Sequence, residues 1–515
     1  MIKHVFVVML ENRSFDHMLG LSQIEGVDAR TGGRTAVLGL DGSEFNETAG
    51  QRFTAGAPAP FIMEFDPGHG FADVVEQLAG PGATYKAGQP YPKCLNTGFA
   101  ANAGANLARV RPPAGVSPGV VMTGYSAEQV PVINALAREF VVCDQWFSSL
   151  PGPTWPNRLF AHAATSGGLD DSPTSLQTLE TLLQGYRFAN GTIYDSLDRK
   201  GLPWSIVEGD ALPQVLSLGG MVARALDGRF INLETFLARI ADPAFSDAYT
   251  FIEPNYGHVL ADGRNFKCGN SQHPLDDVTR GEQFLKLIYE AVRRSPHWPE
   301  SLMIVMYDEH GGFFDHVAPP ESVAPGDAFI GGLNRHGFTF DRLGVRVPAV
   351  IISPYADKGV VDHTVYDHAS VPATLAKLFE MDPLTNRDRA AATLDHLFVR
   401  STPRDNAPLS LPAPAASGIP DCEDTFAGQL AGDTETALGK LEGPLEPTIA
   451  GFMHVAVARQ LQLAAAVDRD VDGAIQRVGD RLRSEFQSVT TTFHAARLLR
   501  KAELDYQNWT KSGRK

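Results

Sequence analysis

"HVFVVMLEN", residues 4–12, is the stretch that decides the fold class. It begins with an apolar run from Val5 to Leu10 and changes abruptly to the polar residues Glu11 and Asn12. A short apolar run bounded by polar residues is typical of a strand that is buried on both faces. The stretch therefore predicts a buried strand with polar side chains placed directly after its end.

Similar apolar runs recur along the chain and predict further buried strands. They are Phe140–Cys143, Trp204–Val207, Thr250–Ile252, Leu302–Met306 and Val347–Ile352. Helical patterns lie between them, at Ala127–Arg138, Gly281–Arg294 and Val371–Phe379. Because strands alternate with helices, the chain is predicted to adopt an α/β fold with a mostly parallel central sheet flanked by helices.

Polar residues follow nearly every one of these predicted strands. They are Glu11 and Asn12, Asp144, Glu208, Glu253, and Asp308 and Glu309. In open α/β sheets, ligands bind at the carboxyl ends of the strands. We therefore expect the functional site at this edge of the sheet.

Length and charge limit the functions that the chain can have. Its 515 residues are enough for a large core, and 43% hydrophobic with 20% charged residues is typical of a soluble globular protein. The formal net charge of -16 argues against nucleic acid as the main partner, because phosphate backbones need a basic surface. It says less about small phosphate-bearing molecules, which a local site can attract.

The ends of the chain show no targeting or membrane-spanning segment. No secretory signal pattern and no run of about 18 apolar residues is visible, so we expect a cytoplasmic protein, or one exported without a classical signal. The four cysteines, Cys94, Cys143, Cys268 and Cys422, are far apart and are expected to be buried or inert thiols.

The C-terminal part differs in composition from the rest. Residues 401–447 begin with the proline-rich "STPRDNAPLSLPAPAASGIPD" and are predicted to be a linker or surface arm. Thr448–Val467 and Val471–Arg500 look helical, which gives a catalytic domain 1–400, an arm 401–447 and a C-terminal helical segment 448–515. We expect the final helix to be solvated, with contact to a membrane surface or a role between domains as the alternative.

Two motifs place chemistry at the predicted edge. In "YDEHGG", residues 307–312, the adjacent carboxylates of Asp308 and Glu309 repel each other unless a cation or protons lie between them. Glu11 and Asn12 end another strand in the same way, which favours one cation bridging both strands over a merely solvated pair. In "PGPTWPNRLF", residues 151–160, Thr154 is predicted at a helix N-terminus, which attracts anions. The alternative is that Thr154 is only an N-cap.

Histidines in polar turns complete the candidate residues. His69, His258 and His273 could bind phosphate oxygens, protonate a leaving alcohol, or ligate a second metal. A single histidine in a loop is more often structural. A functional role for these three is therefore indicated only if they lie beside the predicted cation site.

The motifs together resemble a known family. "ENRSFDHMLG", "DPGH", "VMTGYSAEQVPV", "CDQWF", "PNRLFAHAATS" and "YDEHGGFFDHV" are similar to the phosphoesterase family of bacterial phosphatidylcholine-hydrolysing phospholipases C. Acid phosphatases and plant non-specific phospholipases C also belong to that family. The resemblance extends from about residue 2 to about residue 380, which is most of the chain. It implies a fold like that of alkaline phosphatase.

The resemblance implies a role for each matched residue. Those matched to ligands of a divalent cation are Glu11, Asn12, Thr154, Asp308 and Glu309. Those matched to catalytic roles are Thr154 as the nucleophile, with His69, His258 and His273 on the phosphoryl oxygens and the leaving group. Oxygen ligands suit Ca²⁺, Mg²⁺ or Mn²⁺, and Zn²⁺ becomes competitive if histidines ligate. For His310, His316 and His368 we expect supporting or packing roles.

Three functions are consistent with these residues. The first is a phospholipase C that acts through a phospho-threonine and cleaves glycerophospholipids, such as phosphatidylcholine, to diacylglycerol and a phosphorylated head group. The second is an acid phosphatase that hydrolyses phosphomonoesters, and the third is a non-catalytic binding protein on the same scaffold. The expected partners are a phospholipid or phosphomonoester substrate and, for the first function, a membrane surface. The sequence leaves the oligomeric state open.

Overall fold

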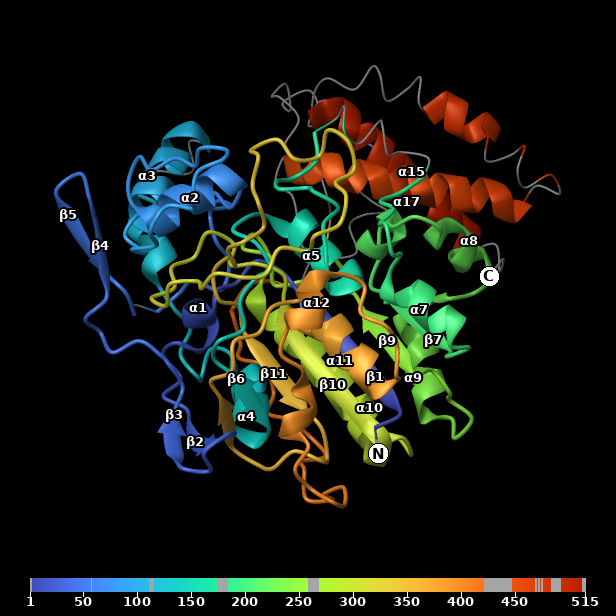
Figure 1. Ribbon diagram of the computed structural model, residues 1–515, viewed down its shortest axis with the longest axis horizontal. Helices are drawn as coiled ribbons and strands as arrows, with labels where there is room; N and C mark the ends of the chain where they lie inside the picture. The colour runs from blue at the N-terminus through green and yellow to red at the C-terminus, as the bar shows by residue number, and fades with distance from the viewer. Residues whose placement is uncertain are drawn as a thin grey trace.

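A large mixed sheet forms the centre of the molecule (Figure 1). The computed structural model describes residues 2–56, 58–110, 115–174, 177, 184–257, 268–420, 447–467, 470, 473, 476–482 and 492–511. Within these residues the sheet has ten strands in the order β3-β2-β12-β6-β11-β10-β1-β9-β7-β8. Only β11 and β3 run antiparallel to the described strands beside them. The predicted α/β fold with a mostly parallel sheet is confirmed.

The predicted strands form the middle of this sheet. They are β1 (His4–Leu10), β6 (Val141–Cys143), β7 (Trp204–Glu208), β9 (Tyr249–Ile252), β10 (Ser301–Tyr307) and β11 (Ala349–Ile352). Strand β1 pairs in parallel with β10 along its whole length and with β9 on its other side, and all its residues are buried. The carboxyl ends of β1, β9 and β10 therefore meet at one edge.

Short outer strands complete the sheet and were not predicted. They are β2 (Glu25–Asp28), β3 (Arg34–Ala36), β8 (Phe230–Asn232) and β12 (Val360–Asp362); a separate hairpin consists of β4 (Phe45–Thr48) and β5 (Gln51–Thr54). Each is three or four residues long and includes polar or charged residues, so none contains a clear apolar run. In Figure 1 the hairpin projects away from the sheet at the left.

Two groups of helices flank the sheet. The first consists of α4 (Pro131–Glu139), α9 (Leu233–Ala241) and α10 (Val278–Arg294), and the second of α5 (Thr154–Ala163), α7 (Ile193–Arg199), α11 (Ser370–Leu378) and α12 (Asn386–Ala390). The other helices that the structure describes before residue 400 are α1 (Phe15–Leu19), α2 (Phe71–Ala79), α3 (Phe99–Val110), α8 (Met221–Leu226) and the 3₁₀ turns η1 (Pro118–Met122), η2 (Gln214–Ser217), η3 (Trp298–Glu300) and η4 (Leu394–Leu397).

Prolines account for two differences between prediction and structure. Strand β11 begins at Ala349 instead of Val347, because Pro348 has no N–H to donate to a neighbouring strand. Helix α4 begins at Pro131 instead of Ala127, since proline favours the first helical position and restricts the residue before it.

The C-terminal segment is helical and packs onto the rest of the molecule. Helix α15 (Pro447–Val467) contacts α5, α8, η2 and α17 (Thr492–Lys511). The predicted helix Thr448–Val467 is confirmed. Of the predicted helix Val471–Arg500, the described residues 473, 476–482 and 492–500 are helical, and residues 471, 472, 474, 475 and 483–491 lie outside the described residues. The expectation of a solvated final helix is wrong for one face of α17, where Leu499 and Ala502 are buried.

The arm and the cysteines can be followed only in part. Residues 401–420 lie along α10, where Tyr289 donates its hydroxyl to Pro408 O at 2.7 Å; residues 421–446 are outside the described residues. The division at 400 and 447 stays a prediction. Cys94 and Cys143 are free thiols as expected, but Cys268 is disulfide-bonded, so the expectation of a thiol is wrong there. Among the described helices, none is long and apolar enough to span a membrane.

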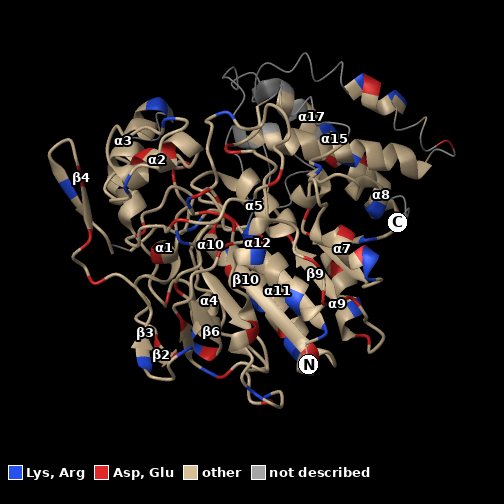
Figure 2. Cartoon of the chain, viewed as in Figure 1, with Lys and Arg blue, Asp and Glu red and all other residues tan. Residues whose placement is uncertain are grey.

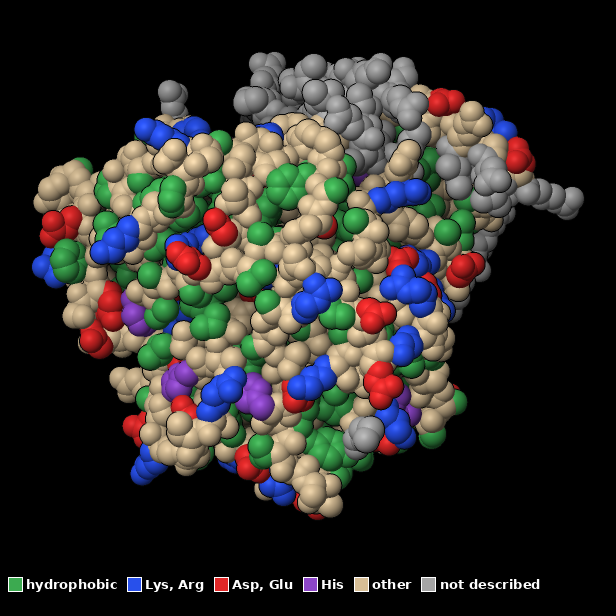
Figure 3. All heavy atoms as spheres, in the orientation of Figure 1, with side chains coloured by type: hydrophobic (Ala, Val, Ile, Leu, Met, Phe, Trp, Pro, Cys, Tyr) green, Lys and Arg blue, Asp and Glu red, His purple; other side chains and the backbone are tan. Residues whose placement is uncertain are grey.

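Charged side chains are dispersed over the molecule. Figure 2 shows acidic and basic residues on many helices and loops, and on the face in Figure 3 the Lys and Arg side chains lie among acidic and apolar ones. This face offers no continuous basic stripe of the kind that nucleic-acid binding needs, as far as the described residues cover it.

Candidate active site

The ends of β1 and β10 bring four predicted residues together. Glu11 and Asn12 follow β1, and Asp308 and Glu309 follow β10, its parallel neighbour. The backbone N–H of Asn12 donates to Asp308 Oδ1 at 3.0 Å, so the two strand ends are joined directly. All four side chains are buried. The predicted meeting of these residues at the carboxyl edge is confirmed.

Thr154 approaches the same edge from α5. It is the first residue of the helix, as predicted, and its Oγ1 lies 3.4 Å from Asn12 Oδ1, to which it donates. The N-cap of α5 is Pro153 and makes no side-chain cap bond, so the alternative that Thr154 is only an N-cap does not hold. The hydroxyl of Thr154 therefore faces the strand ends, at the positive end of a helix dipole.

Arg158 is the residue of this site that the sequence analysis did not assign. It lies one helical turn after Thr154, donates Nε–H to Asp308 Oδ2 at 3.0 Å and forms an ion pair between its NH2 and Glu11 Oε1 at 3.4 Å. The signal was present in the quoted motif "PNRLF": an arginine four residues after Thr154 lies on the same face of the helix.

Three buried side chains at the strand ends carry atoms without a hydrogen-bond partner among the residues that the structure describes. Within the described part of the chain, the buried atoms Glu11 Oε2, Glu309 Oε1 and Asn12 Nδ2 have no hydrogen-bond partner. Asn12 Oδ1 accepts from Thr154 and keeps a second lone pair for a cation. Burying such atoms without a partner is costly, so these side chains fit an oxygen-liganded cation.

The electrostatics of the strand ends agree with this fit. Burial, opposed by Arg158 and reinforced by nearby carboxylates, raises the pKa of Glu11 well above its usual value and that of Asp308 to about 6. Burial is the larger cause of both shifts, and the neighbouring carboxylates add to it. Asp308 differs from the others in that both its oxygens already accept hydrogen bonds, from the N–H groups of Asn12 and Glu309 and from Arg158.

A second acidic cluster is already neutralised. Ligand atoms of Asp16, Asp315 and His316 lie within 4.8 Å of one another. However, Arg346 is fully buried there and pairs with Asp315 Oδ1 at 2.8 Å and with Asp16 Oδ1 at 2.9 Å. We interpret this cluster as an ion-pair network that fixes α1 against the loop after β10.

Two of the three predicted loop histidines lie beside Asp66. His69 donates Nδ1–H to Pro67 O at 2.8 Å, and His273 Nε2 lies 3.6 Å from Asp66 Oδ2. Burial lowers the pKa of His69, but the carboxylates of Glu309 and Asp66 outweigh it and raise the value to about 9. Burial, with the charges of His69 and Arg13, lowers the pKa of His273. His258 lies outside the described residues.

These two histidines therefore differ in charge at neutral pH. In the metal-free protein the pKa shifts favour the imidazolium form of His69 and the neutral form of His273, a division that suits one proton donor and one proton acceptor.

The other histidines support the strand ends, as expected. His368 donates Nε2–H to Asp308 O at 2.6 Å, and His310 lies between Glu309 Oε2, 3.4 Å from its Nδ1, and Gln77 Oε1, 2.8 Å from its Nε2. His310 thereby connects Gln77 of helix α2 to the carboxylate of Glu309. Gln77 also donates to Gly68 O at 2.6 Å and so holds the loop that carries His69.

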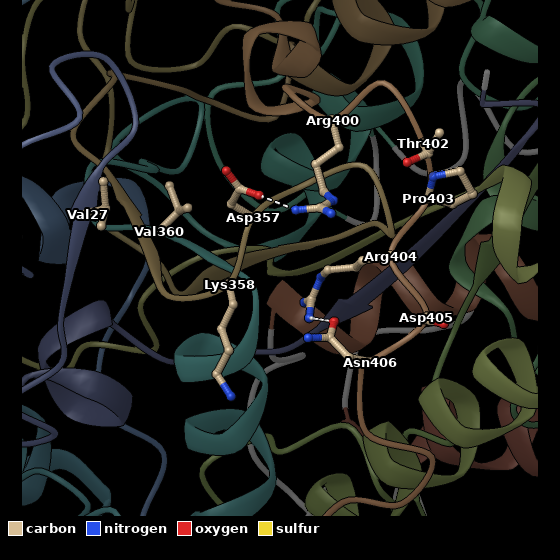
Figure 4. A pocket seen from close by; sticks show the side chains of 10 residues that line it. All are labelled: Val27, Asp357, Lys358, Val360, Arg400, Thr402, Pro403, Arg404, Asp405 and Asn406. Carbon is tan, nitrogen blue, oxygen red and sulfur yellow. Dashed lines mark hydrogen bonds and ion pairs between the residues drawn. The ribbon is translucent and has the colours of Figure 1, made fainter.

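An open cavity elsewhere in the molecule is not this site. It measures about 670 Å³ and lies beside the start of β12 (Figure 4). Its cations are already paired: Arg400 with Asp357 at 2.8 Å, and Lys358 with Glu139 at 2.7 Å. None of the described residues that line it is a predicted site residue.

Comparison with known proteins places the chain in a family. The model of the Phosphoesterase family matches residues 2–382, and the chain belongs to this family. Non-specific phospholipase C3 of Arabidopsis thaliana is 37% identical over 80% of this chain and 76% of its own length. Non-specific phospholipase C6 of the same plant is 36% identical over 86% and 81%, and phospholipase C A of Mycobacterium tuberculosis is 28% identical over 85% of both. The chain is accordingly an enzyme, a phosphoric ester hydrolase.

Solved structures are more distant. A protein of the alkaline phosphatase superfamily from Vibrio parahaemolyticus is 16% identical, with a TM-score of 0.31 over 52% of this chain and 65% of that chain. Phosphonate monoester hydrolase of Agrobacterium radiobacter is 11% identical, with a TM-score of 0.30 over 53% and 73%. The first belongs to the superfamily whose fold was expected, but at these TM-scores neither says anything about the chemistry of this chain.

Proposed function

We propose that this enzyme is a metal-dependent phospholipase C that cleaves glycerophospholipids, such as phosphatidylcholine, to diacylglycerol and a phosphorylated head group. The observation that carries the proposal is the position of Thr154, whose hydroxyl lies 3.4 Å from Asn12 Oδ1 beside three buried carboxylates. The plant and mycobacterial relatives named above are phospholipases C, which supports a phosphodiester over a monoester as the substrate.

The cation would be held by Glu11, Asn12, Thr154, Asp308 and Glu309. When bound, a divalent cation would lower the pKa of the threonine hydroxyl and balance the charge of the phosphate. The oxygen donors favour Ca²⁺, Mg²⁺ or Mn²⁺, and histidine ligation would favour Zn²⁺.

Thr154 is the nucleophile of the proposed reaction. Thr154 loses its hydroxyl proton to solvent, its Oγ1 attacks phosphorus and forms a phospho-threonine, and the bond from phosphorus to the glycerol oxygen breaks. The N–H groups at the start of α5 stabilise the negative oxygens of the phosphoryl group. Arg158 offsets one of the negative charges of Glu11 and Asp308, which weakens their repulsion of the incoming phosphodiester.

The histidines move the protons. Because Nδ1 of His69 is held by Pro67 O, its Nε2 is the nitrogen that can hold a phosphoryl oxygen or protonate the departing alcohol. His273, which is neutral, accepts a proton from the water that hydrolyses the phospho-threonine. His258 would assist at the same step, and the phosphorylated head group then leaves.

Turnover of phosphatidylcholine vesicles compared with p-nitrophenyl phosphate tests this function. We expect the vesicles to yield diacylglycerol and phosphocholine, with a loss of activity in EDTA. Contact with the lipid surface is part of the proposal. If the monoester turns over well and the phospholipid is untouched, the enzyme is instead an acid phosphatase; if neither reacts under any cation, the non-catalytic alternative stands.

A further inference from the structure

The two oxygens of Glu11 have different surroundings. Oε1 accepts a hydrogen bond from Gln214 Nε2 at 2.9 Å and lies 3.4 Å from Arg158 NH2. Oε2 is buried and, as far as the described residues extend, has no hydrogen-bond partner. One oxygen is thus fixed by the protein, and the other is left for a ligand.

Gln214 is itself held firmly. It begins the 3₁₀ turn η2, and its backbone N–H donates to Glu253 Oε2 at 2.7 Å, while Val215 N–H donates to Glu253 Oε1 at 2.8 Å. Glu253 directly follows β9, the parallel neighbour of β1. Glu253, at the end of β9, therefore holds Gln214, which in turn donates to Glu11 at the end of β1.

A tyrosine and the arginine of α5 close these contacts into a ring. Tyr256 donates its hydroxyl to Glu253 Oε2 at 2.6 Å and accepts from Arg158 NH1 at 2.9 Å. The ring runs Glu11, Gln214, Glu253, Tyr256, Arg158 and back to Glu11. Gln214, the most exposed of the five, is only 4% exposed. A closed polar network in a dry interior holds its members in one arrangement.

The chemistry of the ring requires an amide at position 214. Glu11 Oε1 can only accept when ionised, so the side chain facing it must present a donor, which fixes the orientation of the Gln214 amide. A carboxylate here would repel Glu11, and a lysine or arginine would add a charge that competes with a divalent cation. Glutamine supplies the donor without changing the charge.

We propose that Gln214 is a positioning residue of the metal centre, which holds Oε1 of Glu11 so that Oε2 is the oxygen presented to the divalent cation. This inference rests on the proposed metal dependence. Partners that orient a metal ligand in this way typically change metal affinity by about 10- to 100-fold when they are removed.

The test is calorimetric titration of the metal-free full-length protein with Ca²⁺, Mg²⁺, Mn²⁺ and Zn²⁺, each alone. For the cation that the wild type binds, Gln214→Met should raise Kd by about 10- to 100-fold. The matched control is Gln462→Met: Gln462 is also buried and accepts from Arg459 NH1 at 2.6 Å, but it lies on α15, outside the ring. The control should bind the cation with wild-type Kd.

A second readout separates positioning from folding. At saturating cation, Gln214→Met should recover most of the wild-type kcat, because the nucleophile is intact, and the Tm of both variants is measured in EDTA. If Gln214→Met does not fold, Tyr256→Phe breaks the ring by removing one oxygen, and Kd should rise by about 10-fold, the lower end of the range.

The outcomes distinguish this inference from the proposed function. A wild type that binds none of the four cations overturns the metal dependence, and with it the inference. A wild type that binds, together with folded Gln214→Met or Tyr256→Phe whose Kd stays within twofold of wild type, overturns the role of Gln214 alone.

Discussion

Asn12 combines an unusual backbone with a side chain at the centre of the site. Its φ is 58°, in the left-handed region, and its N–H donates to Asp308 Oδ1. Asparagine tolerates this region better than other residues with a Cβ, whereas glycine adopts it freely. The backbone and the amide of Asn12 can therefore be tested separately.

Asn12→Gly and Asn12→Ala form a matched pair. Both remove the amide, so both should lose turnover and bind the cation more weakly. Only alanine is strained at this φ, so Asn12→Ala should be less stable than Asn12→Gly by about 1 kcal/mol in urea unfolding. Equal stabilities would contradict the strain, and wild-type turnover in Asn12→Gly would contradict the role of the amide.

His69 should titrate far from its usual range in the metal-free protein. Glu309 and Asp66 outweigh burial and raise its pKa from 6.5 to about 9. A raised folded pKa stabilises the fold fully below pH 6.5, and this contribution is lost as the pH rises through 9. Adding the cation neutralises Glu309 and should lower the pKa of His69.

Histidine-selective NMR measures this titration, with His69→Gln to assign the signal. We expect a midpoint near pH 9 without metal and a lower one with it. A metal-free midpoint at or below 6.5 would show that the two carboxylates do not control this histidine.

At the scale of elements, helix α5 provides both the nucleophile and its neutralising charge. Arg158 is 3% exposed and pairs with Asp308 and Glu11. Arg158→Met leaves both carboxylates unpaired and should cost about 3–5 kcal/mol of unfolding free energy in EDTA. Added cation should stabilise Arg158→Met more than it stabilises the wild type, because the cation neutralises the same carboxylates as Arg158.

Arg387→Met is the matched control for Arg158→Met. Arg387 is equally buried and pairs with Asp367 at 2.8 Å. This variant should be destabilised in urea unfolding, and cation should restore no more than in the wild type. If the cation raises the unfolding free energy of both variants equally, Arg158 is not coupled to the metal site.

The sequence predicted the elements with strong local patterns. The central strands were predicted because each is a buried apolar run, and Glu11, Asn12, Asp308 and Glu309 were placed together because parallel strands end at the same edge. Gln214 and Tyr256 were missed because their contacts depend on tertiary structure: Gln214 meets Glu11 across 203 positions of sequence. The outer strands β2, β3, β8 and β12 were missed because each is short and includes polar or charged residues that interrupt an apolar run.

At the scale of the whole molecule, the C-terminal helices share the core of the sheet. Phe452 and Met453 of α15 belong to the same apolar cluster as Val7 of β1. Arg459 of α15 forms an ion pair with Glu208 at the end of β7, and Tyr506 of α17 donates to the same carboxylate. The C-terminal segment is therefore packed against the edge that carries the site.

Gly451 tests this packing. A Cβ at this position would lie 1.9 Å from the ring of Trp155, the residue after Thr154. Gly451→Ala should displace Trp155, destabilise the protein by about 1–3 kcal/mol and lower kcat. Gly104→Ala on α3 is the control, since its Cβ would meet only Pro118 at 3.8 Å, and it should be neutral or stabilising. Thermal unfolding and turnover measure both, and an unchanged kcat in folded Gly451→Ala would show that α15 does not constrain the nucleophile.

The central claim is that Thr154 carries the phosphoryl group during turnover. Rapid acid quenching of the enzyme with phosphatidylcholine, followed by mass spectrometry of its peptides, tests this directly. The account predicts a phosphorylated head group on Thr154 in the wild type, and neither adduct nor turnover in a folded Thr154→Ala variant. Near wild-type turnover in Thr154→Ala, or an adduct on another residue, would contradict it.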